Sequence, residues 1–393
     1  MKTEVPARRR LPIAKASAAI LAIVAALVLA QRLREFSHRY DQFDFVVFYG
    51  WWSDYSSGGD PWTDLQGHMR GCNYTPVFVE GFSPLARLDQ KTAFRIWQTV
   101  QVLCIFTAVL LVARGNAPPL GGAPTIIVLS LVLMSRPFAS ALAWSQIAPM
   151  LLALLCAAWF CTQRHRPAAA GLLVALAALL KLFPAGVAGY FLFSRNWRAF
   201  AWTIGVFAAG VLITNPHRWL ELVTNGLPIA YRISGHSAVT VLSFARQSVE
   251  HFSGTRGRGQ PLFAVWGLTA LIDFALLTIA AALTIVAHGR ADLDGILFGL
   301  WAALALLMSP LVRERDMLLL LPAYLLGLLA AWQGYRPREP HGNTALLAGG
   351  AMLSICILPN LIKAFPHPGF PALLAAYLGA ALILGARTRE ERR

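Results

Sequence analysis

Charged residues are scarce in this sequence: 13% of its 393 residues are charged, whereas 57% are hydrophobic. Soluble globular proteins usually carry about 25% charged residues. The composition therefore excludes a soluble globular protein and indicates a surface that faces lipid. Acidic residues are scarcer than basic ones, and the formal net charge is +15. The arginines form short clusters between apolar runs, not a stripe beside aromatic residues, so they indicate membrane topology and some phosphate binding rather than nucleic-acid recognition.

Signals of several other protein classes are missing. The five cysteines are odd in number and four lie inside apolar runs, so no disulfide framework follows. There is no GxxxxGK[ST] loop, no GxGxxG after a strand and no paired Asp-x-Asp in the polar segments, which leaves a soluble nucleotide-sugar donor unsupported. His68, His217 and His251 have no metal-ligand spacing. We therefore expect neither a cofactor nor a bound metal.

Apolar runs dominate the sequence. A membrane-spanning helix needs about 20 mostly apolar residues. The runs that approach this number, about twelve, are residues 13–31, 93–113, 123–142, 146–163, 168–180, 183–194, 199–214, 262–287, 294–312, 317–333, 344–362 and 370–386. The first run resembles a signal peptide, but its length and the many later runs favour an uncleaved first helix. The sequence predicts an all-α polytopic membrane protein.

Basic residues predict how these runs are oriented. Short clusters such as Arg164 with Arg166 are expected on the cytoplasmic side, as are both termini. All clusters fall on that side provided that residues 168–194 enter the membrane and return to the side where they began. This segment is too short for two full crossings and is interrupted by Lys181-Leu-Phe-Pro184. We therefore expect a broken hairpin of two short helices.

Two long polar segments, residues 32–92 and 215–261, are expected on the outer side, together with the short turn Ser309–Asp316. Polar segments of this length in a compact protein are usually functional or disordered. The aromatic content of these two argues against disorder. We expect residues 1–393 to form a single transmembrane domain with structured outer loops, the first of which carries a catalytic aspartate.

That aspartate is Asp44, which follows the first apolar run and stands among aromatic residues. A carboxylate with apolar neighbours near the membrane face tends to have a raised pKa, which suits a general base. The alternatives are that Asp44 caps a helix or is an ordinary surface carboxylate.

Lys181 is the most costly residue to place in a membrane. A charged side chain in the centre of a membrane helix costs about 2.5–3.5 kcal/mol on insertion scales. Its presence indicates either an anionic partner, such as a donor phosphate, or a side chain that reaches back to the interface.

A third group of polar residues lies in the outer stretch 231–246. Arg232, His236, Ser237 and Arg246 on a short, partly apolar segment suit a lipid-linked phosphate, which arginine grips with paired hydrogen bonds. The alternative is an amphipathic helix held at the interface by lipid headgroups. Arg313, Arg315 and Asp316 add charge at another outer turn, either as ligand contacts or as a cluster that satisfies itself.

Several of these residues occur in an order that resembles glycosyltransferase family 87. The matching segments are Asp44-Phe, Phe48-Tyr49, Gly58-Gly-Asp-Pro-Trp62, Tyr74-Thr-Pro76, Trp97, Ser145-Gln146, Ala170-Gly, Lys181-Leu-Phe-Pro184, Ser234-Gly-His-Ser237, Arg246 and Ser309-Pro. They cover about residues 40–325. Each is loose by itself, but six or seven in register are fairly specific.

The resemblance implies a GT-C fold and inverting, metal-independent transfer of a mannosyl group from a polyprenyl-phosphate donor. The acceptor would be a lipid- or polymer-linked glycan at the outer face of the cytoplasmic membrane. Asp44 would be the catalytic base. The donor phosphate would be bound by Arg232, His236, Arg246 and Lys181, and the substrates by Tyr49, Tyr74, Gln146, Ser237, Arg313 and Arg315.

Two departures from the family pattern leave the sugar open. Gly235-His236-Ser237 stands where the family tends to have Asn-Gln-Ser, and Arg313 and Arg315 stand where it often has an aromatic residue and a histidine. The transferred group could therefore be another hexosyl or a pentosyl group. Two other functions stay open at this point: a lipid or solute transporter, and a non-catalytic membrane protein of envelope assembly.

Overall fold

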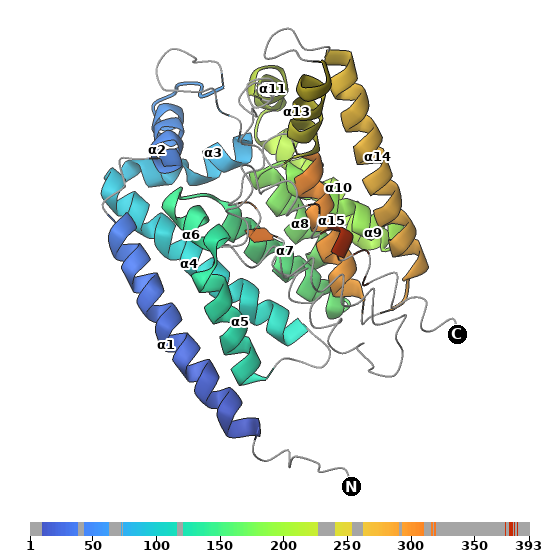
Figure 1. The fold of residues 1–393 in the computed structure, drawn as a ribbon. Coiled ribbons are helices and arrows are strands. Elements are labelled where there is room, and N and C mark those ends of the chain that lie inside the picture. Colours follow the sequence, from blue (N-terminus) through green and yellow to red (C-terminus); the bar gives the residue numbers. More distant parts are fainter. Residues whose placement is uncertain are drawn as a thin grey trace.

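The computed structural model describes residues 10–37, 43–62, 72, 74–115, 121–226, 240–253, 262–290 and 293–309, and residues 316, 318–319, 374, 377–379, 381 and 383. Within these residues every regular element is a helix, and none is a strand (Figure 1). The prediction of an all-α protein is confirmed for this part of the chain.

The helices follow one another along the chain with short connections. They are α1 (Arg10–Phe36), α2 (Phe43–Ser56), α3 (Pro76–Phe82), η2 (Ser83–Arg87), α4 (Gln90–Gly115), α5 (Gly122–Met134), α6 (Arg136–Ala143), α7 (Ala148–Gln163), α8 (Pro167–Leu180), η3 (Phe183–Val187), α9 (Ala188–Phe193), α10 (Trp197–Ile213), α11 (Pro216–Glu221), η4 (Leu222–Gly226), α13 (Val241–Ser253), α14 (Leu262–Val286) and α15 (Asp294–Met308). In Figure 1, α1 and α14 lie on opposite flanks of the bundle.

Three of the described helices are long and apolar enough to cross a membrane: α1 over Lys15–Phe36, α4, and α14 over Phe263–Val286. The number rises to five if each of two bent pairs, α5 with α6 and α10 with α11, counts as one span. The remaining apolar helices are shorter. Because the predicted runs 317–333, 344–362 and 370–386 lie almost entirely outside the described residues, the total of about twelve stays a prediction.

The predicted continuous run 123–142 was wrong in one respect, because it forms two helices that meet at an angle of 53°. Ser135 ends α5 and caps α6, and its hydroxyl accepts a hydrogen bond from the backbone N–H of Phe138 (3.4 Å). Pro137 stands in the first turn of α6, where it lacks an N–H to continue the preceding helix. The Arg32 side chain of α1 donates to the carbonyl oxygens of Leu133 (2.7 Å) and Met134 (3.1 Å), which satisfies the end of α5.

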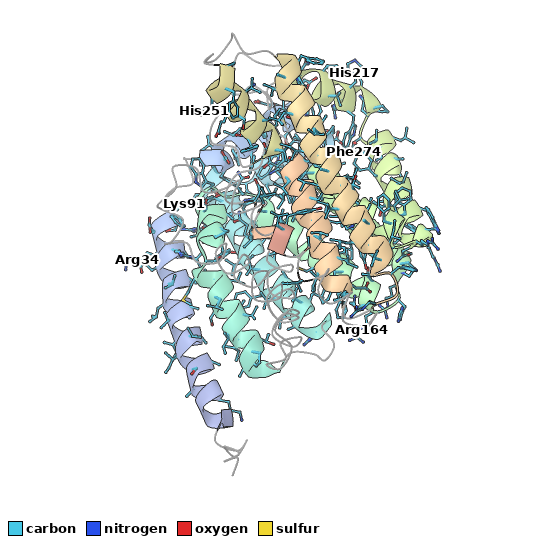
Figure 2. All side chains as sticks on the ribbon, turned by 45° about the vertical axis from the view of Figure 1, so that its right-hand side comes forward. Arg34, Lys91, Arg164, His217, His251 and Phe274 are labelled. Atoms are coloured by element: carbon cyan, nitrogen blue, oxygen red, sulfur yellow. The ribbon has the colours of Figure 1, made fainter. Side chains whose placement is uncertain are left out.

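The two segments expected as outer loops are mostly helical where they are described. Residues 32–92 contain α2, α3 and η2, and residues 215–261 contain α11, η4 and α13. In Figure 1, α2, α11 and α13 lie at the same end of the molecule, away from the start of α1. Figure 2 shows His217 and His251 at this end and Arg164 at the opposite end. The two segments therefore share one end of the bundle.

The helices α8 and α10 lie side by side and run in the same direction. Near their starts, the Thr203 hydroxyl donates a hydrogen bond to the carbonyl oxygen of Gly171 (3.2 Å). Near their ends, the Leu179 side chain packs against Gly210. Because these helices are separated only by residues 181–196, the intervening chain must return to the end where α8 began. This confirms the predicted broken hairpin.

The break itself lies where the sequence predicted it. The helix α8 ends at Leu180, and Lys181 is extended, with φ −154° and ψ 130°. Pro184 explains this, since its ring would clash with the carbonyl group four residues earlier if the helix continued. The chain then forms η3 and α9, which lead back toward the start of α10.

A substitution at Gly171 tests this close packing. A Cβ atom at that position would overlap the carbonyl oxygen of Ala199 in the backbone of α10. We therefore expect Gly171→Ala to lower the stability of the purified protein by about 1–3 kcal/mol, as overpacked cores do, measured as a fall in Tm in detergent. Gly205→Ala is the matched control on α10, because nothing lies within 4 Å of a Cβ there. An equal Tm for Gly171→Ala and Gly205→Ala would contradict the packing.

Candidate active site

The helix α2 carries Asp44 in its first turn and is fixed by buried aromatic residues. The ring of Phe48 lies 5.0 Å from that of Tyr74 and 6.1 Å from that of Trp97, measured between centroids. The Phe45 ring lies 5.0 Å from Phe94 of α4. Aromatic pairs of this kind contribute about 0.5–1.5 kcal/mol each beyond the area that they bury. This packing fixes α2 on α4, and so fixes the backbone that carries Asp44.

Tyr74 is held at the start of α3 by hydrogen bonds on both sides. The indole N–H of Trp62 donates to the Tyr74 carbonyl oxygen (3.1 Å). The next residue, Thr75, caps α3, and its hydroxyl donates to the carbonyl oxygen of Leu179 at the end of α8. Pro76 occupies the first turn, where a missing N–H costs nothing. The Tyr-Thr-Pro segment thus joins α3 to the end of α8, one residue before Lys181.

Ser145 and Gln146 form the connection between α6 and α7. Ser145 has a φ of 55°, which is a left-handed conformation unusual for a residue with a side chain. The indole N–H of Trp97 donates to the Ser145 carbonyl oxygen (2.7 Å), and the Gln146 N–H donates to that of Ala141 (2.9 Å). These bonds hold a strained turn that directs the Gln146 side chain.

Asp44, Gln146 and Tyr74 are linked side chain to side chain. The amide Nε2 of Gln146 donates to Oδ2 of Asp44. The Tyr74 hydroxyl donates to Oε1 of Gln146 (3.2 Å). Asp44 is partly buried, whereas Gln146 and Tyr74 are buried. Three residues that lie far apart in the sequence therefore form one hydrogen-bonded group.

Lys181 lies on the other side of Tyr74 and has an anionic partner. Its Nζ is 3.0 Å from Oδ1 of Asp316, and the two side chains are 16% and 2% exposed. The ammonium also lies 5.6 Å from the centre of the Tyr74 ring and 5.3 Å from that of Phe183, within the range of cation–π attraction. Of the two alternatives for Lys181, the anionic partner is the one observed. Asp44, Gln146, Tyr74, Lys181 and Asp316 are called the polar line below.

Comparison with known proteins identifies the family. The sequence model of glycosyltransferase family 87 matches residues 73–310, which is more than half of the chain. The chain belongs to glycosyltransferase family 87. Curated proteins contain no sequence that matches it. Among solved structures, the crystal structure of ArnT from Cupriavidus metallidurans bound to undecaprenyl phosphate is similar, with a TM-score of 0.44 and 15% identity, over 95% of this chain and 77% of ArnT.

The matched range includes part of the polar line of this family 87 protein. Tyr74, Gln146 and Lys181 lie inside residues 73–310, whereas Asp44 and Asp316 lie outside. The place of Asp44 in the site therefore depends on its hydrogen bond to Gln146.

A second set of contacts joins the two segments expected on the outer side of this family 87 protein. The guanidinium of Arg218 in α11 donates to Oε1 of Glu80 (2.6 Å) and to the Tyr55 hydroxyl (3.1 Å), and it lies 4.8 Å from the centre of the Tyr55 ring. Burial by itself would lower the pKa of Arg218, but the hydrogen bonds to Tyr55 and Glu80 outweigh it and raise the pKa. Arg218 thus ties the far end of α2 to α3 and α11.

The other residues predicted for the site are placed as follows. Tyr49 lies apart from the polar line, and its hydroxyl donates to the carbonyl oxygen of Leu88 (2.7 Å), which ties α2 to the end of η2. Arg246 is partly buried on α13, a helix that packs mainly against α14. The structure does not describe Arg232, His236, Ser237, Arg313 or Arg315.

Sequence reasoning did not select Asp316 as a site residue, although it placed that residue in a charged turn. The signal was the cost of Lys181 in the membrane, which calls for a nearby carboxylate. Asp316 is the acid that meets this need. Among the described residues, no group of three or more His, Cys, Asp or Glu side chains is placed to hold a metal ion.

Proposed function

We propose that this family 87 protein transfers a mannosyl group, or another hexosyl or pentosyl group, from a polyprenyl-phosphate sugar to a lipid- or polymer-linked glycan. The proposal includes a GT-C fold. The observation that carries it is the hydrogen-bonded group of Asp44, Gln146 and Tyr74 in a chain of this family. This group supplies a carboxylate at a defined position beside an otherwise apolar bundle.

In this proposal Asp44 is the general base. It removes the proton from one acceptor hydroxyl while that oxygen attacks the anomeric carbon of the donor sugar. The bond from that carbon to the phosphate oxygen breaks, and polyprenyl phosphate leaves. Attack from the side opposite the leaving group inverts the anomeric configuration. One carboxylate suffices, because no covalent glycosyl-enzyme forms.

Cationic side chains are proposed to stabilise the leaving phosphate. Arg232, His236 and Arg246 were selected for this task because arginine and protonated histidine bind phosphate oxygens with charge-assisted hydrogen bonds. Lys181 shares the task only if a phosphate can approach an ammonium that Asp316 already contacts. Since polyprenyl phosphate is a good leaving group by itself, the proposal assigns no step to a metal ion or another cofactor.

The proposed location is the cytoplasmic membrane, crossed several times, with both termini in the cytoplasm and the site facing the periplasm or exterior. Two observations support it. The helices α2 and α11 lie at one end of the molecule, and Arg164 lies at the other (Figures 1 and 2). Basic residues tend to remain on the cytoplasmic side.

The test is to incubate the purified protein with radiolabelled polyprenyl-phosphate mannose and a panel of envelope glycolipids. Release of polyprenyl phosphate together with labelled glycolipid is expected. Movement of the donor across liposomes without transfer would instead indicate a transporter. Neither transfer nor movement with any of the donors and acceptors tried would favour a non-catalytic role in envelope assembly.

A further inference from the structure

Gln146 uses both atoms of its amide group on neighbouring side chains. Nε2 donates to the Asp44 carboxylate, and Oε1 accepts from the Tyr74 hydroxyl (3.2 Å). The residue is 3% exposed. A side chain so buried and so occupied offers little to a substrate, which sets it apart from the substrate-binding role that the sequence predicted for it.

The chemistry of the three groups permits only one orientation of this amide. An ionised carboxylate only accepts hydrogen bonds, so it must meet the NH₂ side of the amide. The amide oxygen then faces Tyr74, whose hydroxyl can donate to it. Tyr74 therefore fixes the orientation of Gln146, and Gln146 in turn fixes one oxygen of Asp44. The other carboxylate oxygen, Oδ1, takes no part in the bond to Gln146.

The backbone beneath Gln146 carries a cost that a simple connection between helices would not need. Ser145 has a φ of 55°, and a left-handed residue other than glycine costs about 1–3 kcal/mol where the surroundings impose it. The indole of Trp97 and the carbonyl oxygen of Ala141 hold the turn in place. Strain of this kind concentrates at functional sites.

We propose that Gln146 is a positioning residue that fixes the Asp44 carboxylate for proton abstraction, and that Tyr74 holds the Gln146 amide in the orientation this requires. This inference rests on the proposed function of Asp44 as the base. A base must lie within hydrogen-bond reach of the proton that it removes, and small errors in its position cost rate. A carboxylate held by one oxygen keeps the other oxygen aimed at the acceptor hydroxyl.

The first experiment compares Gln146→Met with Gln101→Met. Methionine matches the length of glutamine but cannot donate to a carboxylate. We expect Gln146→Met to lower kcat for sugar transfer by about 10–100-fold, the usual worth of a hydrogen bond to a charged group. The donor KM should stay within about twofold, because a positioning residue acts on the transition state rather than on binding. Tyr74→Phe, which leaves the amide oxygen without its donor, should lower kcat by about 3–10-fold.

Gln101→Met is the matched control. Gln101 is a glutamine of α4 that is 0% exposed, and neither atom of its amide has a hydrogen-bond partner in the described part of the chain. The same substitution there should leave kcat unchanged and should not lower Tm, because it removes an unsatisfied buried amide. A fall in kcat for Gln101→Met equal to that for Gln146→Met would overturn the inference.

The second experiment places Gln146→Met in an Asp44→Asn background. If Gln146 acts only through Asp44, the double variant should transfer sugar at the rate of Asp44→Asn alone, within about twofold. Multiplied losses would show that Gln146 acts independently of Asp44 and would overturn the inference, as would a raised donor KM with unchanged kcat. The proposed function fails separately: in that case Asp44→Asn itself retains the wild-type rate.

Discussion

Asp44→Asn is expected to lower the rate of sugar transfer by about 10²–10⁴-fold, the range that general bases contribute in enzymes. Asparagine has nearly the shape of aspartate, and its Oδ1 can still accept the hydrogen bond from Gln146. It cannot take up a proton from an acceptor hydroxyl. The substitution therefore removes the base while it keeps the packing of α2 on the aromatic residues beneath it. The measurement is the initial rate of label transfer from the polyprenyl-phosphate sugar to the glycolipid.

Asp54→Asn is the matched control, since Asp54 is an aspartate at the other end of the same helix. It should transfer sugar at the wild-type rate. Both variants should retain the wild-type Tm and bind the donor lipid as the wild type does, because neither substitution changes the volume of the side chain. Wild-type turnover by Asp44→Asn would remove Asp44 as the base and leave the proposed mechanism without a proton acceptor.

Lys181→Met is expected to cause the largest loss of stability, roughly 3 kcal/mol of unfolding free energy. The physical reason is Asp316, which is 2% exposed and pairs with the Lys181 ammonium at 3.0 Å. Removal of the lysine leaves a buried carboxylate without its countercharge, and this costs more than the ion pair contributes while intact. The fall should appear as a lower Tm of the purified protein in detergent.

Two further variants separate this explanation from a general sensitivity to lost lysines. Lys91→Met changes an exposed lysine at the start of α4 (Figure 2) and should alter stability by less than about 0.5 kcal/mol. The double variant Lys181→Met with Asp316→Asn should recover most of the lost stability, because the unpaired charge is gone. If the double variant were no more stable than Lys181→Met, the buried charge of Asp316 would not be the cause.

Local features of the fold could be predicted because their causes are local. An apolar run of about 20 residues forms a helix in lipid, since no other arrangement satisfies its backbone. The break after Leu180 follows from Pro184 three residues beyond Lys181. The end of the predicted run 123–142 was less clear, because the bend at Ser135 depends on a cap, and on Arg32 reaching across from α1.

The composition of the site could be predicted, but not its connections. Asp44, Tyr74, Gln146 and Lys181 were selected from their order in the sequence and from the cost of charge near lipid. The sequence assigned Gln146 to substrate, whereas the structure places its amide between Asp44 and Tyr74. Tyr49 was selected in the same way, and its hydroxyl lies on Leu88 instead of within the polar line.

The sequence by itself determined that this chain is helical and lipid-facing, that α8 breaks beside a lysine, and which polar residues are too costly to be incidental. Only the tertiary structure decided which of them meet. Gln146 follows Asp44 by 102 positions, and Asp316 follows Lys181 by 135. Hydropathy and propensity act over a few residues, whereas such partners depend on how α2, α7 and α8 pack, and packing is a property of the whole bundle.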